Sequence, residues 1–313
     1  MKLLKMVQNI NRYQNIFPGS ENGFWKNVLD NIEDITEIRI RVNQPIRIYF
    51  RQQENSLDKD GNIIRSYLNG KVFRYQDIQK LLDFWCMDSR YAFSEEIKQG
   101  FLTIKGGHRI GICGEVIKDA QGNLQTIKYI SSLNIRIAHE VVGVANEMME
   151  YIYHKNRVLN TLIISPPGAG KTTLLRDIVR SLSYGNEQWR GKNVGVVDER
   201  GEIAACFQGI PQLDVGPRTD ILDNCEKIVG IRMLLRVMAP EVIAVDELGN
   251  DEEKNMVSHM VGRGSTVIAT IHGDKKQQEK ILKEPWSEAF GLFVFLHKEQ
   301  NDFQTEIYLR REG

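Results

Sequence analysis

The sequence predicts an α/β protein whose second half is a mostly parallel sheet with helices on both faces, preceded by an α+β N-terminal domain. Two observations predict the second half. Between residues 161 and 180, an apolar β-branched run, a turn rich in Pro and Gly and an amphipathic helix follow one another. Further apolar runs downstream end in polar residues, as buried parallel strands do. The 313 residues suffice for two domains, which we place at residues 1–148 and 149–313.

Composition indicates an ordinary globular protein. Lys plus Arg number 41 and Asp plus Glu number 41, so no net charge attracts nucleic acid. The four cysteines lack metal-site spacing and are typical of reduced thiols in the cytoplasm. The N-terminus lacks the apolar core of a signal peptide, and no stretch approaches the ~20 apolar residues that cross a bilayer. We therefore expect a cytoplasmic protein without a membrane span, held at any membrane by a partner.

The N-terminal half mixes helical and alternating patterns. Residues 35–42 alternate apolar and charged side chains, which predicts a half-buried strand. Gly106, Gly107 and residues 121–123 are hairpin signals. The other expected elements are a helix within the first thirty or so residues, a strand after Pro45, a polar loop or hairpin tip at 52–62, helices at 76–87 and 91–99, and strands at 101–105, 108–118, 124–130 and 133–138.

Arginines concentrate on these strands, at Arg39, Arg41, Arg47, Arg109 and Arg136. The solvent-facing side of alternating strands explains them without any ligand. A second interpretation is that Arg109 and Arg136, which lie nearest the second half in sequence, reach a phosphate. A guanidinium there would stabilise the transition state of phosphoryl transfer, from a second domain or a neighbouring subunit. The sequence leaves both interpretations open.

The turn between strand and helix predicts a phosphate-binding loop. Glycines let backbone N–H groups converge on an anion, and the following helix presents its free N–H groups to the same charge. Lys171 adds a mobile ammonium for the β- and γ-phosphates, and the Thr172 hydroxyl is the expected Mg²⁺ ligand. Ser165 stands where the motif G-x-x-x-x-G-K-[ST] has its first Gly. The predicted nucleotide contacts are Ser165, Pro166, Pro167, Gly168, Ala169, Gly170, Lys171, Thr172 and Thr173. A Gly-rich connection without a ligand is the alternative.

An acidic cluster follows the apolar run that begins at Asn193. It consists of Asp198, Glu199, Arg200 and, after Gly201, Glu202. Ligands of open α/β sheets bind at the carboxyl ends of the strands, so the cluster is expected to face the phosphate loop. A solvated turn is the alternative interpretation.

The next strand, residues 242–249, runs straight into Asp246 and Glu247. An acidic residue at this place can hold Mg²⁺ through water, and its neighbour can orient or deprotonate the attacking water. We assign Asp246 to the metal and Glu247 to the water. Glu199 or Glu202 could take the second role instead.

Residues 265–274 predict a fourth strand, which ends in Thr270 and His272. An imidazole here could hydrogen-bond the γ-phosphate or the lytic water and report its presence. A structural histidine is the equal alternative. Two further strands, at 291–297 and 303–311, close the predicted sheet.

The order of these four motifs resembles the Walker A, Asp box, Walker B and His box of the secretion ATPase superfamily of type II and type IV secretion systems. The segment IRMLLRVMAPEVIAVDELGN is similar to the Leu-Arg…Pro…Glu strand of these proteins. The resemblance implies a RecA-like P-loop ATPase domain with ATP and Mg²⁺ as ligands, and Glu247 as its Walker B acid.

More narrowly, the chain resembles the stage III sporulation protein AA family over most of its length. The segments that carry this resemblance are EIRIRVNQP, GFLTIKGGHRIGICGE, SLNIRIAHEV, VVDERGEIAAC, LDVGPRTDIL and VIAVDELG. It implies a cytoplasmic ATPase on the mother-cell side, at the base of a secretion-like channel to the forespore. The protein would act as a homo-oligomeric ring, a hexamer, docked on membrane proteins of that channel.

Two other functions remain open. A nucleic-acid-dependent ATPase would use the basic strands together with Tyr49, Phe50 and Phe101 as a binding groove, although the zero net charge argues against it. A switch that binds nucleotide with little turnover is the third possibility, because acidic strand ends do not reveal turnover.

Overall fold

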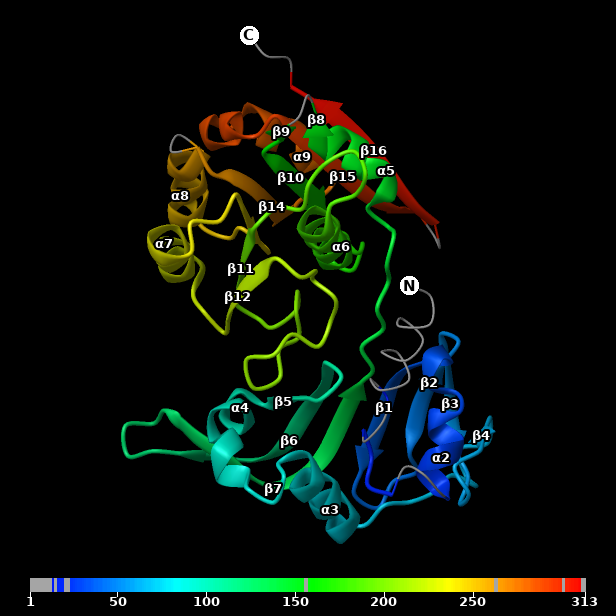
Figure 1. Ribbon diagram of the computed structural model, residues 1–313. Coiled ribbons are helices and arrows are strands. Elements are labelled where there is room, and N and C mark those ends of the chain that lie inside the picture. Colours follow the sequence, from blue (N-terminus) through cyan, green and yellow to red (C-terminus); the bar gives the residue numbers. More distant parts are fainter. Residues whose placement is uncertain are drawn as a thin grey trace. The chain divides into compact units, whose positions relative to one another are not determined.

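The computed structural model describes residues 13, 16–19, 23–154, 157–261, 264–299 and 302–310, which form two compact units (Figure 1). The first comprises Met1–His139 with Ala205–Gln212, and the second comprises Glu140–Ala204 with Leu213–Gly313. The sequence placed the division between residues 148 and 149. Ala205–Gln212 belongs to the first unit, where the N–H of Gly106 donates to Gln212 Oε1 at 2.8 Å. Such a short segment has no periodicity that would assign it. Much of the helix expected before residue 30 lies outside the described residues.

The first unit is built on one antiparallel sheet with the strand order β4-β3-β2-β1-β7-β6-β5. Its strands are β1 Ile35–Arg41, β2 Arg47–Phe50, β3 Gln53–Leu57, β4 Ile63–Ile64, β5 Phe101–Ile104, β6 His108–Lys118 and β7 Leu124–Arg136. Its helices are α2 Phe24–Leu29, α3 Tyr75–Trp85 and α4 Ser94–Gln99, with 3-10 turns at Ile32–Asp34 and Arg90–Phe93. The α+β prediction for this half is confirmed.

Two local predictions in this unit were wrong. The polar segment 52–62 contains strand β3, because Ser56 and Leu57 are buried and β3 pairs with β2 in spite of its polar composition. The strands expected at 124–130 and 133–138 are one continuous strand, β7, which carries a bulge opposite Gly114. A Cβ on Gly114 would lie 2.4 Å from the carbonyl oxygen of Lys128, so only Gly permits this bulge.

The two faces of this sheet differ as alternation predicts. Ile38, Ile40, Ile110 and Ile135 are fully buried and share one core with the apolar side chains of α3. The arginines lie on the other face. The strand register there sets Arg109 opposite Arg136, and Arg136 opposite Glu37. Arg39 of β1 likewise lies directly opposite Arg47 of β2 in the strand register.

The second unit is built on a sheet with the order β12-β11-β13-β14-β10-β15-β16, parallel except for its edge strand β16. Its strands are β10 Thr161–Ser165, β11 Val194–Asp198, β12 Thr219–Asp223, β13 Val242–Val245, β14 Thr266–His272, β15 Leu292–Glu299 and β16 Asp302–Leu309. Its helices are α5 Asn146–Ile152, α6 Lys171–Tyr184, α7 Lys227–Val237, α8 Asp251–Val261 and α9 Lys275–Lys283, with a 3-10 turn at Pro285–Ala289. The short strands β8 Tyr153–His154 and β9 Arg157–Val158 pair apart from this sheet.

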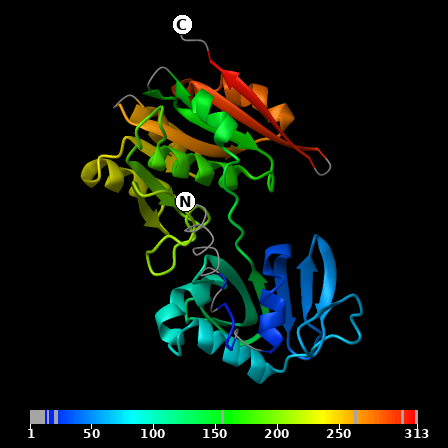
Figure 2. The ribbon, with the colours of Figure 1, turned by 45° about the vertical axis from the view of Figure 1, so that its right-hand side comes forward.

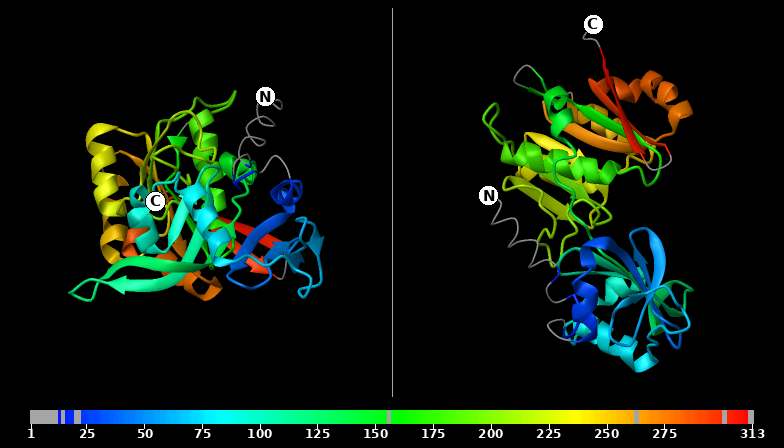
Figure 3. Two further views of the ribbon diagram at one scale, coloured as in Figure 1. Left: turned by 90° about the horizontal axis from the view of Figure 1, so that it is seen from below. Right: turned by 90° about the vertical axis from the view of Figure 1, so that its right-hand side faces the viewer.

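Helices cover both faces of the parallel sheet, which confirms the predicted doubly wound arrangement. Leu162 and Ile164 of β10 share a core with side chains of α7, α8 and α9, whereas Ile163 alternates to the face on which α6 packs. Figure 2 and the right-hand view of Figure 3 show the green helix α6 on one face and the orange helix α9 on the other. Strand β12 was not predicted, because TDILD offers only two apolar residues.

The register of the parallel strands brings the predicted motifs together at one edge. Ser165 at the end of β10 is paired with His272 at the end of β14. Val245 at the end of β13 is paired with Ala269, which also lies on β14. Asp198 ends the neighbouring strand β11, which pairs with β13. The phosphate loop, both acidic motifs and the histidine therefore meet at the carboxyl edge of the sheet.

Candidate functional site

The loop between β10 and α6 has an open surface over its two glycines. Gly168 has φ 73° and Gly170 has φ 87°, values that favour Gly, and a Cβ built on either would meet no heavy atom within 4 Å. Helix α6 begins at Lys171, so its first N–H groups lie next to this open surface. These features fit a cradle for a phosphate chain.

Ser165 tolerates its place because the backbone does not need glycine there. It is fully buried as the last residue of β10 and does not have a left-handed conformation. Its carbonyl accepts the N–H of Gly273 at 3.1 Å, and its hydroxyl donates to the carbonyl of Pro166 at 3.1 Å. The departure from the motif therefore leaves the positive-φ turns at Gly168 and Gly170 intact.

Asp246 is held by two hydroxyl groups from different elements. Thr172 Oγ1 donates to Asp246 Oδ2 at 2.7 Å, and Thr270 Oγ1 donates to Asp246 Oδ1. Thr270 in turn accepts the N–H of Glu247 at 2.8 Å. The Thr172 hydroxyl and the Asp246 carboxylate are hard oxygen donors, which fit Mg²⁺. Among the described residues no group of three or more His, Cys, Asp or Glu side chains could hold a metal. The remaining Mg²⁺ ligands would therefore be water and phosphate.

Glu247 makes contacts through both of its carboxylate oxygens. Arg200 Nη1 donates to Oε2 at 2.6 Å, and His272 Nε2 lies 2.9 Å from Oε1. The same His272 nitrogen lies 3.4 Å from Lys171 Nζ. It either donates to Glu247 or accepts from Lys171, because one ring nitrogen cannot do both. Glu247 also has φ 55°, a left-handed conformation that strains a side-chain-bearing residue and is found at functional sites.

Glu199 of the acidic cluster is held by a buried ammonium group, that of Lys227. Lys227, only 6% exposed, forms an ion pair with Glu199 and lies 3.8 Å from Glu253 Oε2. Glu253 accepts the N–H of Gly249 at 2.8 Å. Lys227 therefore joins the acidic cluster, the first turn of α7 and the loop before α8.

The other carboxylates of the cluster have different environments. Asp198 is 1% exposed, and its two oxygens accept the N–H groups of Glu202, Ile203 and Ala204, each at 2.9 Å. Burial raises its pKa, although these N–H groups oppose the shift. Asp198 thus organises the turn, and the carbonyl of Glu202 accepts from Arg176 Nη2 at 2.6 Å. Glu199, Glu202, Asp246 and Glu247 all line one small cavity together with Arg200 and Lys227.

Sequence reasoning singled out neither Arg200 nor Lys227 as a functional residue. Arg200 lies inside the acidic cluster, and an arginine among carboxylates was an available signal for an ion pair. Lys227 begins an ordinary amphipathic helix, and nothing in its sequence neighbourhood marks it.

Arg109 and Arg136 belong to the first unit, whereas all the other predicted site residues belong to the second. The guanidinium of Arg109 stacks on Phe101 at 3.9 Å from the ring centroid, and Arg136 is exposed. Two like charges directly opposite each other on neighbouring strands repel, and a bound anion would relieve that repulsion. On the same face, Arg39 and Arg47 form ion pairs with Glu37 and Glu54.

A pH-dependent stability arises at Asp223, which ends β12 beside Asp198. Burial, and then the charge of Asp198, raises its pKa from 3.8 to about 6, and its Oδ1 has no hydrogen-bond partner among the described residues. The folded pKa exceeds the unfolded value of about 3.9, so stability is greatest below pH ~4 and is lost as the pH rises through about 6. The two-unit shift corresponds to about 3 kcal/mol, which partial solvent exposure reduces to about 1 kcal/mol.

We therefore expect Asp223→Asn to raise the free energy of unfolding by about 1 kcal/mol at neutral pH, and the gain to vanish below pH ~4. Urea denaturation across this pH range measures both effects. Asp220→Asn, which removes an exposed carboxylate of the same strand, is the matched control and should change little. A pH-independent gain at Asp223 would contradict the assigned cause.

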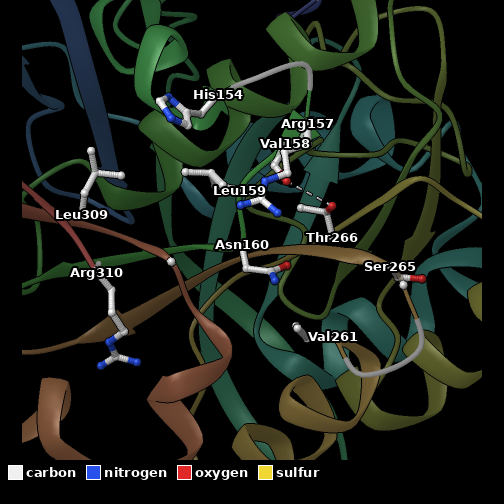
Figure 4. Close-up of a pocket in the computed structure, with 12 residues that line it drawn as sticks. His154, Arg157, Val158, Leu159, Asn160, Val261, Ser265, Thr266, Leu309 and Arg310 are labelled. Carbon is white, nitrogen blue, oxygen red and sulfur yellow. Dashed lines mark hydrogen bonds between the residues drawn. The ribbon is translucent and has the colours of Figure 1, made fainter. Parts of the chain in front are cut away.

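A second cavity, of about 690 Å³, lies at the opposite edge of the sheet, where β10, β14 and β15 begin (Figure 4). Its polar groups hold the strands together. Asn160 Oδ1 accepts the N–H of Val267 at 2.8 Å, and Thr266 donates to the carbonyl of Val158 at 3.4 Å. The guanidinium of Arg310 donates to the carbonyls of Ser287 and Leu282. These contacts are structural, and ligands of parallel sheets bind at the other edge.

No helix among the described residues is long and apolar enough to cross a membrane.

Two solved structures share the fold of this chain. The ATPase DotB of Legionella pneumophila matches with a TM-score of 0.52 and 13% identity, over 89% of this chain and 77% of that one. The pilus retraction motor PilT, solved with bound ADP, matches with a TM-score of 0.59 and 14% identity, over 91% of this chain and 82% of that one. The fold is therefore a RecA-like ATPase domain preceded by an N-terminal domain.

Sequence comparison is more specific than the fold. Stage III sporulation protein AA of Bacillus subtilis (strain 168) is 39% identical over 282 residues, which cover 87% of each chain. The family model described as "Sporulation stage III, protein AA" matches residues 10–310. The chain therefore belongs to the stage III sporulation protein AA family.

Proposed function

We propose that the second unit binds ATP with Mg²⁺ and hydrolyses it to ADP and phosphate, as a motor of the secretion ATPase type. One observation carries the proposal: side chains from the ends of the two strands β13 and β14 and from the start of α6 lie within hydrogen-bonding distance of one another beside the open glycine loop. They are Lys171, Thr172, Asp246, Glu247, Thr270 and His272. The family and the ATPase folds of DotB and PilT support the same reading.

Each residue has a role that its contacts suit. The loop residues from Ser165 to Thr173 would surround the phosphates, with the N–H groups of the residues from Gly168 onward as donors and Lys171 neutralising charge on the β- and γ-phosphates. Thr172 and Asp246 would hold Mg²⁺, which neutralises charge on the phosphate oxygens. Thr270 keeps the Asp246 carboxylate and the Glu247 backbone in register. Glu247 would then accept a proton from the attacking water.

Glu247 must leave its present partners before it can act as a base. Arg200 and His272 occupy both carboxylate oxygens in this structure. A γ-phosphate beside Lys171 would compete with Glu247 for the guanidinium of Arg200 and for a hydrogen bond from His272, because a phosphate carries more negative charge than a carboxylate. Binding of ATP would thereby release Glu247. Such a release step also suits the alternative function, a nucleotide switch with little turnover.

The working state we propose is a homo-oligomeric ring, a hexamer, on the cytoplasmic, mother-cell side of a sporulation membrane. The ring would dock on membrane proteins of a secretion-like channel. Arg109 and Arg136 would contribute positive charge to a γ-phosphate, in cis or in trans. Their opposed positions on β6 and β7 support an anion-binding role. Nucleic acid is a weaker candidate for this face, because Arg39 and Arg47 are already paired with carboxylates.

Mixing two inactive variants tests action in trans. Lys171→Ala removes the phosphate-loop charge, and Arg136→Ala removes the proposed transition-state cation. If arginine acts on a neighbour, a mixed ring contains sites with an intact Lys171 in one subunit and an intact Arg136 in the next. We expect the mixture to regain phosphate release that neither variant has alone. Steady-state phosphate assays at several mixing ratios measure it.

The matched control is Arg41→Ala, on the same face of the sheet but on strand β1, which pairs with β7. Alone, this variant should retain turnover. Absence of any recovery, with mixed assembly verified by size-exclusion chromatography, would count against action in trans.

A further inference from the structure

A groove of about 430 Å³ lies between α7 and α8, which run side by side on the second unit (Figure 1). Its lining residues come only from these two helices and fall into an apolar floor and a basic rim. The floor is Leu235, Met256 and Met260, and the rim is Arg232, Arg236 and His259.

The floor is suited to an apolar side chain of varying shape. Methionine is unbranched and flexible, so a groove with two of them adapts to Leu, Met or Phe from a partner. Helix α7 also leaves apolar side chains uncovered beside the groove. Val229 is 45% exposed, Met233 47% and Val237 73%, at a spacing of four residues along one stripe of the helix. An apolar stripe on a helix is ordinarily covered by another element.

The rim supplies the charge that selects the partner. Arg232 and Arg236 are one helical turn apart, and neither makes an ion pair or side-chain hydrogen bond within the described part of the chain. No carboxylate is among the lining residues. A flat lipid surface could touch the exposed stripe, but it would not fill a groove. A helix whose carboxylates are one turn apart matches both the arginine spacing and the floor.

We propose that this α7–α8 groove binds an amphipathic helix of a partner protein that carries acidic residues four apart, with apolar residues between them. The arginines pair with the carboxylates, and the methionine floor receives the apolar side chains. Binding requires neither nucleotide nor turnover, so the proposal stands or falls independently of hydrolysis. Helix α7 begins at Lys227, which is tied to Glu199 in the acidic cluster. The groove therefore lies on the helix whose first residue is tied to the acidic cluster.

The test uses two fluorescein-labelled helical peptides of about 18 residues. One carries Leu at helical spacing with Glu pairs four apart, and the other has Lys in place of every Glu. Fluorescence anisotropy with the full-length protein, without nucleotide, measures both affinities. The wild type is expected to bind the Glu peptide about tenfold more tightly than the Lys peptide.

Charge reversal in the groove should exchange this preference. Arg232→Glu with Arg236→Glu is expected to weaken binding of the Glu peptide about tenfold and to strengthen binding of the Lys peptide. Tighter binding of the Lys peptide by this variant would also show that the variant is folded. The matched control is Lys276→Glu with Lys280→Glu, the same charge change at the same spacing on the exposed face of α9. It should change neither affinity.

Four outcomes would overturn the proposal. The first is equal binding of both peptides by the wild type, and the second is an effect of the control variant as large as that of the charge reversal. The third is sedimentation with anionic phosphatidylserine vesicles that depends on Arg232 and Arg236, while the Glu peptide does not bind. The fourth is efficient cross-linking of two copies of the chain through the Cys introduced by Met233→Cys. The last two would assign the groove to a membrane or to a second copy.

Discussion

Replacing Glu247 with Gln is expected to lower phosphate release at least about 100-fold while ATP remains bound. The amide keeps the shape of the side chain and an oxygen that accepts from Arg200, so the site should stay assembled. It cannot accept the proton of the attacking water, which is the step we assign to Glu247. Steady-state phosphate assays and equilibrium binding of a fluorescent ATP analogue with Mg²⁺ separate the two effects.

Glu252→Gln provides the control, because Glu252 is an exposed carboxylate in the first turn of α8. Its turnover should equal that of the wild type. Persistent turnover in Glu247→Gln would move the role of base to Glu199 or Glu202, and the corresponding Gln variants would identify which. A wild type that binds ATP with Mg²⁺ but releases no phosphate would leave the nucleotide switch as the function.

The second large effect is expected at Lys227. Lys227→Met should lower the free energy of unfolding by about 3 kcal/mol, because it leaves Glu199 and Glu253 near each other without their shared cation. Glu253 is the more sensitive of the two, since its side chain is only 13% exposed. Urea denaturation of the full chain measures the loss.

Two further variants test whether the unpaired carboxylates cause that loss of stability. Adding Glu199→Gln and Glu253→Gln to Lys227→Met removes the unpaired charges and should recover part of the stability. Lys192→Met is the matched control, because its ammonium is similarly shielded while its partner Glu241 keeps Arg190 and the Asn193 N–H. It should cost less than about 1 kcal/mol. A cost at Lys227 no larger than at Lys192 would show that the buried ion pair contributes little.

The contacts of Lys227 also bear on the choice of general base. Sequence alone left Glu199, Glu202 and Glu247 as candidates. In the fold Glu199 is engaged by a buried lysine on α7, whereas Glu247 follows the strand that carries Asp246 and is held by partners that a phosphate attracts. This difference in surroundings favours Glu247 as the general base. It also makes Lys227 a physical connection between the acidic cluster and the helix that forms one wall of the α7–α8 groove.

Much of the fold follows from local pattern. The apolar runs at β10, β11, β13 and β14 are buried on both sides and therefore nearly continuous in sequence, which made them recognisable. The ends of these strands carry the loop, the carboxylates and the histidine, and the rule that ligands bind at carboxyl ends predicted that they would meet. Strand β12 escaped because its five residues are mostly polar.

By itself, the sequence determined the two-part α/β architecture, the phosphate loop and the order of the four motifs, because each depends on neighbours within a few residues. Only the tertiary structure decided the partners of the catalytic candidates. Arg200 reaches Glu247 across 47 residues and Lys227 reaches Glu199 across 28, and no local periodicity encodes such ion pairs. The α7–α8 groove likewise exists only once two helices separated by β13 pack together. Charge pairing and surface shape depend on distance in space, whereas strand and helix patterns depend on distance along the chain.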